Sequence, residues 1–140
     1  MSKTFLYRFL GLGRVPESIL APLKAEGMLL YDEGIRGSVT YKNFRGGGRY
    51  SNWKRQWFSS TIALTNKRLW ALRLRSQIID VQLDDPRLKQ MEFTFEAPKT
   101  FVAAFDAGLF ETDWSGRIEY RFQTPEARTL LENLSNNLSG

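Results

Sequence analysis

The sequence predicts a mainly β protein: a half-open barrel of about seven antiparallel strands with a C-terminal helix that covers one end. From residue 35 on, short segments alternate apolar and polar residues, and turn residues separate them at regular spacing. The last segment instead has leucines at helical spacing. Because a meander of short strands must cover its apolar face and its edges, we expect this helix to close the barrel.

The first 27 residues are expected to form an N-terminal segment with one short helix, and residues 28–140 the barrel. Pro16 opens the helical segment and Gly27 ends it like a C-cap. Phe5, Leu6, Phe9, Leu10 and Leu12 precede it. They suit an N-terminal turn packed on the core, with an interfacial membrane anchor as the alternative.

Seven strands are expected after a short apolar run at 28–34. They are 35–44, 55–65, 68–75, 77–83, 90–96, 100–107 and 117–124. Residues 66 and 67 form a tight hairpin turn, in which Asn66 is expected at positive φ. Met91, Phe93 and Phe95 are expected to point inward, and so are Ile118, Tyr120 and Phe122.

The final helix is predicted at residues 125–138. Thr124 suits the N-cap position and Pro125 suits the first helical position. Leu130, Leu131, Leu134 and Leu138 form its apolar stripe.

The amino-acid composition limits the kinds of catalytic and metal-binding site that the chain can form. The chain has no cysteine and no histidine, so we expect no disulfide, no metal site, no cofactor and no histidine-assisted nucleophile. The carboxylates Asp106, Glu111 and Asp113 are the best remaining candidates for catalysis, but their spacing fits no calcium loop and favours a turn.

Charge is distributed unevenly. Residues 34–79 hold ten basic residues and no acidic residue, which predicts an anion-attracting face unless the acidic C-terminal half neutralises it. A glycine-rich loop is expected at residues 45–54. The candidate anion-binding residues in and beside it are Lys42, Arg45, Arg49, Lys54 and Arg55. Trp53 and Trp57 are candidate interface residues. The alternative is a solvated loop whose cations keep the sheet edge soluble.

Residues 57–72 and 78–85, WFSSTIALTNKRLWAL and IIDVQLDD, resemble the bacterial pleckstrin-homology and GRAM-type domains. The match at residue level is clearest at Leu64 to Leu69. This resemblance implies a pleckstrin-homology-like barrel in which the loop at 45–54 joins the first two strands and holds anionic head groups. The sequence lacks the spaced Lys/Arg pattern of phosphoinositide-binding members.

Together these features favour a non-catalytic binding module for an anionic membrane surface or a protein partner. Nucleic-acid binding through the basic, aromatic face is the alternative, and a small carboxylate-based enzyme is the second. The apolar N-terminal run is too short for a transmembrane segment, so we expect a cytoplasmic protein, peripheral to the inner membrane surface. The ligand and the oligomeric state stay open.

Overall fold

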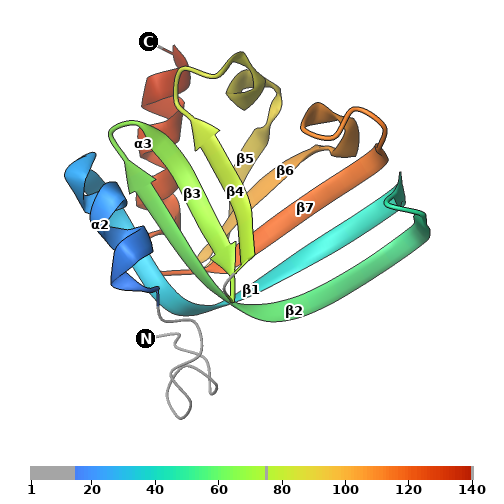
Figure 1. Cartoon of the computed structure of the whole chain (residues 1–140), viewed down its shortest axis with the longest axis horizontal. Helices are drawn as coiled ribbons and strands as arrows, with labels where there is room; N and C mark the ends of the chain where they lie inside the picture. Colours follow the sequence, from blue (N-terminus) through green and yellow to red (C-terminus); the bar gives the residue numbers. More distant parts are fainter. Residues whose placement is uncertain (1–14, 75, 140) are drawn as a thin grey trace.

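A single seven-stranded antiparallel sheet forms the body of the protein (Figure 1). The computed structural model describes residues 15–74 and 76–139. The strands are β1 (Met28–Gly46), β2 (Arg49–Thr65), β3 (Arg68–Arg73), β4 (Ser76–Gln82), β5 (Glu92–Glu96), β6 (Thr100–Asp106) and β7 (Ser115–Gln123). Their order across the sheet is β4-β3-β2-β1-β7-β6-β5, so β4 and β5 are the edges and the barrel is half open. The predicted fold class is confirmed.

Residues 28–34 and 35–44, expected as separate segments, form the one long strand β1. The Gly34 backbone has positive φ, and the pairing of β1 with β2 shifts register between Glu33 and Ile35. Such a bulge bends a strand without ending it. β1 can therefore turn with the curved sheet and still pair along its whole length.

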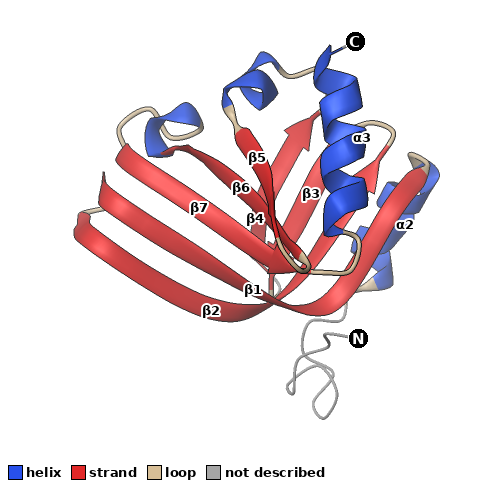
Figure 2. Cartoon of the chain, turned by 180° about the vertical axis from the view of Figure 1, so that it is seen from behind, coloured by secondary structure: helices blue, strands red, loops and turns tan. Residues whose placement is uncertain are grey.

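Two helices cover different parts of the sheet (Figure 2). The short helix expected near the N-terminus is α2 (Glu17–Ala25), and its Leu23 packs on Trp70 and Leu72 at the outside of the sheet. The final helix, α3 (Ala127–Ser139), inserts Leu130 and Leu134 into the concave core. Two short 3₁₀ helices lie in connections between strands: η1 (Pro86–Gln90) between β4 and β5, and η2 (Ala107–Leu109) between β6 and β7. The apolar N-terminal residues 5–12 lie outside the described part of the chain.

The concave core confirms the predicted alternation of side chains. Phe101, Phe122 and Ile118 are buried there, while Glu92 and Glu96 of β5 are exposed. The β2–β3 turn differs from the prediction, since Asn43 and Leu74 are the only non-glycine residues at positive φ in the described chain. Thr65 Oγ1 closes this turn by accepting hydrogen bonds from the Lys67 and Arg68 N–H groups, both at 3.0 Å. The turn therefore forms without a positive φ at Asn66.

Candidate functional site

The predicted loop at residues 45–54 is wrong, because all but two of these residues belong to strands. β1 and β2 stay paired as far as Gly46 and Arg49. Only Gly47 and Gly48 form the turn, with φ of 58° and 74°. Two consecutive positive φ values are what a type I′ hairpin turn needs, and glycine adopts them without steric cost. The glycine run therefore makes a tight turn, and the cations lie on an ordered hairpin.

The predicted cations lie on two faces of the hairpin, and a bulge at Asn43 sets the faces of Arg45 and Arg49. Asn43 has φ of 49°, and the β1–β7 register shifts between Lys42 and Arg45. Residues paired across antiparallel strands share a face. Beyond the bulge Phe44 pairs with Ser51, and both line the concave side. The concave side of this hairpin carries Tyr41, Phe44, Arg49, Ser51, Lys54 and Gln56. The outer side carries Lys42, Arg45, Tyr50, Trp53, Arg55 and Trp57.

On the outer side, arginines lie over exposed aromatic rings. We call this the outer aromatic surface; it consists of Arg36, Arg45, Tyr50, Trp53, Arg55 and Trp57. Tyr50 and Trp53 are each 59% exposed and Trp57 is 50% exposed. The Arg36 guanidinium lies 4.4 Å from the Trp57 ring centroid, and that of Arg55 lies 5.4 Å from the Trp53 ring centroid.

The charge of this surface is not cancelled within the described chain. None of its three arginines has an acidic partner within ion-pair distance in residues 15–74 and 76–139. Arg55 is held by a hydrogen bond from its Nε to Thr40 Oγ1, at 2.9 Å. A guanidinium stacked on a ring keeps donors free at its edge, so the surface can offer both cations and aromatic area to a ligand.

Lys42, in contrast, is paired with an acid and does not add to the unpaired positive charge of the outer aromatic surface. Its Nζ lies 3.1 Å from Glu119 Oε2 on β7. Glu119 also accepts from Arg117 at 2.9 Å and from Arg121 at 3.1 Å. Burial raises the pKa of Glu119, but these hydrogen bonds from Arg117, Lys42 and Arg121 outweigh it and lower the pKa to about 2. The acidic half of the sequence thus neutralises Lys42 but leaves the outer aromatic surface charged.

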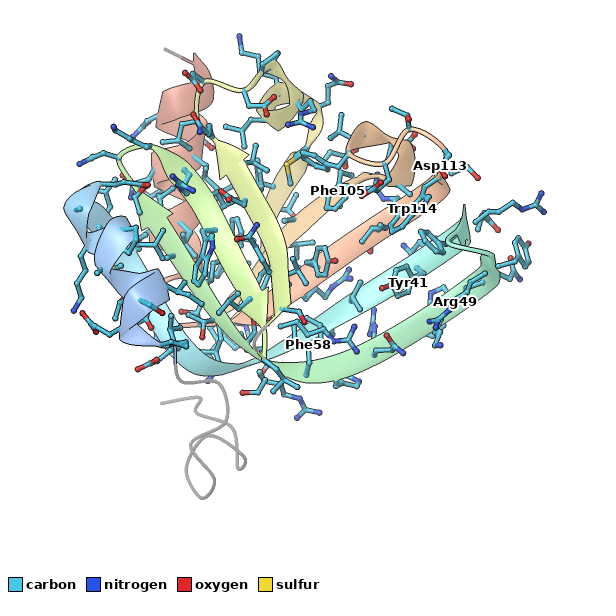
Figure 3. All side chains as sticks on the ribbon, in the orientation of Figure 1. Tyr41, Arg49, Phe58, Phe105, Asp113 and Trp114 are labelled. Carbon is cyan, nitrogen blue, oxygen red and sulfur yellow. The ribbon has the colours of Figure 1, made fainter. Side chains whose placement is uncertain are left out.

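The concave side forms a groove between β4 and the β1–β2 hairpin. It consists of two adjoining cavities of about 400 and 350 Å³, which share Trp114, Ile118 and Tyr120. Figure 3 shows Tyr41, Phe105 and Trp114 inside the curve of the sheet, with Arg49 on β2 near the hairpin end. The Trp114 ring lies against Gly46, where any Cβ atom would collide with it. It also meets the Phe44 ring edge-on, with 5.3 Å between the two ring centroids.

The predicted carboxylate set is spread over this region. Asp106 accepts a hydrogen bond from the Gly108 N–H group at 3.0 Å and so caps η2. Glu111 lines the second cavity, and Asp113 lies beside the hairpin turn. In the described residues, no group of three or more acidic side chains is arranged to hold a metal ion. The capping role explains Asp106 without catalysis.

Comparison with protein-family models gives no match, and neither does comparison with curated proteins. None of the helices within residues 15–74 and 76–139 is long and apolar enough to cross a membrane. The sequence did not single out Tyr120 and Trp114, which line the groove, or Arg73, which lies beside it. Alternation places Tyr120 inside, but Trp114 lies in a turn that carries no periodic signal.

Proposed function

We propose that the protein is a non-catalytic binding module that attaches to anionic membrane surfaces through the outer aromatic surface. The observation that carries this proposal is a set of three exposed rings, those of Tyr50, Trp53 and Trp57. An arginine guanidinium lies over each ring. None of these arginines is paired with an acid in the described chain. Tryptophan and tyrosine favour the membrane interface, and basic residues near an anionic leaflet contribute about 1 kcal/mol each.

The hairpin geometry supports this use. A two-residue turn and continuous pairing hold the rings at set positions on one face, so little side-chain and loop entropy is lost on binding. The element order and the Leu64 to Leu69 match support a pleckstrin-homology-like domain, which we propose as its family. Under the same proposal, the protein is cytoplasmic and binds the inner leaflet of the membrane.

Sedimentation with vesicles tests this function. Vesicles of phosphatidylcholine alone are compared with vesicles that also contain phosphatidylserine, at low and high salt. The protein is expected to pellet only with the anionic vesicles at low salt, because screening weakens exposed charge interactions. The double variant Trp53→Ala/Arg55→Ala is expected to stay in the supernatant. Lys67→Ala/Lys89→Ala changes two exposed cations elsewhere and should pellet like the wild type.

Two results would overturn the membrane proposal. One is a supernatant that retains the folded wild type under every condition. The other is equal pelleting of both double variants. A single-stranded oligonucleotide is tested in parallel, since stacked aromatic residues and arginines also bind unpaired bases. Tryptophan quenching by the oligonucleotide, without vesicle binding, would favour the nucleic-acid function instead.

A further inference from the structure

The concave groove holds a second group of cations, separate from the outer aromatic surface. Arg49 and Lys54, both exposed side chains, line the first cavity, and Arg73 of β3 lies next to its lining residue Gln56. Arg73 donates to Gln56 Oε1 at 3.4 Å and lies 5.1 Å from the Phe58 ring centroid. Across residues 15–74 and 76–139, none of the three has an acid within ion-pair distance. Three cations along one side of the groove, none of them paired with an acid, make this end of the groove favourable for an anion.

Two tyrosines add hydrogen-bond donors at this end of the groove. Tyr41 and Tyr120 line the first cavity, and neither hydroxyl has a hydrogen-bond partner among the described residues. Tyr120 is 9% exposed, and burial raises the pKa of its hydroxyl, which therefore stays protonated. Ser38 Oγ is the only fully enclosed side-chain nitrogen or oxygen without a partner in the described residues, so the Tyr120 hydroxyl still reaches the open space of the cavity and can donate to a ligand there.

The other end of the groove is apolar inside and acidic at its rim. The second cavity is lined by Ile79, Met91, Phe105 and Phe110 together with the shared Trp114. Asp80 and Glu111 lie at its exposed margin, and Asp80 is already paired with Arg68 at 3.3 Å. These acids would repel an anionic group. The groove therefore has a polarity: cations and hydroxyl donors at the hairpin end, and an apolar interior toward β4.

We propose that this groove binds a single-chain amphiphile, with its anionic head group at Arg49 and Lys54 and its hydrocarbon chain along Trp114 and Phe105. The joined cavities have the size and the mixture of apolar lining with a few convergent polar groups that are typical of small-ligand sites. A long-chain carboxylate has this combination of one charge and one apolar chain. The proposal does not rest on membrane attachment, since it uses the opposite face of the hairpin.

Calorimetric titration with dodecanoate below its micelle concentration tests the site. We expect saturable binding of one dodecanoate per chain, and much weaker binding of dodecanol or acetate, which lack the charge or the chain. Arg49→Ala/Lys54→Ala should weaken dodecanoate binding at least about tenfold, because hydrogen bonds to charged groups are lost. Arg45→Ala, on the outer side of the same hairpin, should leave the affinity unchanged.

Tryptophan fluorescence locates the ligand. Of the four tryptophans, Trp114 is the one that lines the groove, while Trp53 and Trp57 lie on the outer side. Dodecanoate should change the fluorescence of the wild type, and Trp114→Phe should abolish that change while heat of binding persists. Absence of saturable dodecanoate binding would overturn the proposal. So would an unchanged affinity in Arg49→Ala/Lys54→Ala, or a fluorescence change that survives Trp114→Phe.

The vesicle experiment and the dodecanoate experiment test the two proposals independently, so one proposal can fail while the other stands. Loss of vesicle pelleting in Trp53→Ala/Arg55→Ala with retained dodecanoate binding supports both proposals on their separate faces. If anionic vesicles bind but soluble dodecanoate does not, the anion is a bilayer head group, and the groove proposal fails while the proposed function stands. If dodecanoate binds but vesicles do not, the groove proposal stands alone.

Discussion

Gly116 of β7 lies directly against the backbone of Asn43 in β1. A Cβ atom on Gly116 would overlap the Asn43 carbonyl group, and both residues have positive φ, 99° and 49°. This contact accommodates the β1 bulge, beyond which Arg49 faces the concave groove and Arg45 faces the outer aromatic surface. One irregularity of the backbone therefore assigns a cation to each of the two proposed sites.

Gly116→Ala is expected to lower the free energy of unfolding by about 2–4 kcal/mol, because a methyl group adds a backbone clash to the cost of positive φ. Gly47→Ala is the matched control, since Gly47 also has positive φ but nothing within 4 Å of a Cβ. It should cost only about 1–2 kcal/mol. Urea unfolding measures both. Equal losses in the two variants would show that the Asn43 contact is not close in solution.

Ser38→Ala and Ser60→Ala should differ, although both serines are completely buried. The Ser38 hydroxyl has no hydrogen-bond partner, whereas the Ser60 hydroxyl donates to the Leu72 carbonyl at 2.7 Å. Removing an unpaired buried hydroxyl should be neutral or stabilising, and removing the paired one should cost about 1 kcal/mol. Thermal unfolding compares them. A marked loss in Ser38→Ala would reveal a partner for its hydroxyl.

Glu119 is expected to make stability depend on acid pH. Its carboxylate has a pKa of about 2 in the folded protein and an ordinary value near 4.5 when unfolded. The stabilisation, on the order of 3 kcal/mol, is present above about pH 4.5 and is lost as the pH falls toward 2. The difference in unfolding free energy between the wild type and Glu119→Gln should therefore shrink over this range. A difference that stays constant with pH would contradict the charge network.

Thr124→Val should loosen the junction between β1 and α3. The Thr124 hydroxyl donates to Asp32 Oδ2 at 2.6 Å and accepts from the Glu126 N–H group at 3.1 Å. Its loss should cost about 1–2 kcal/mol, because a hydrogen bond in the turn before α3 and a bond to a charged group both disappear. Thr94→Val, at an exposed strand position, is the control and should change the unfolding midpoint little. The same midpoint for both variants would exclude this role.

Local sequence signals were sufficient for the five strands from β3 to β7 and for the final helix, but not for the full length of β1 and β2. Alternation identified the inward faces of β5 and β7, since side-chain direction in a strand follows from the backbone itself. The Thr124 side chain accepts a hydrogen bond from the Glu126 N–H group in the turn that leads into α3, but the helix begins at Ala127, two residues later than predicted. The glycine run was misinterpreted as a loose loop, because two glycines suffice for the turn and the third stays paired in β1.

The sequence by itself determined the fold class, the strand faces away from irregularities, and the concentration of positive charge in residues 34–79. These follow from periodicity and composition, which are local properties of the chain. The tertiary structure decided which cations remain available. Lys42 is neutralised by Glu119, 77 residues away, and a bulge beside Gly116 sets which of Arg45 and Arg49 faces the groove. Both depend on contacts between β1 and β7, and pairing between strands so distant in sequence is set by the packing of the whole sheet.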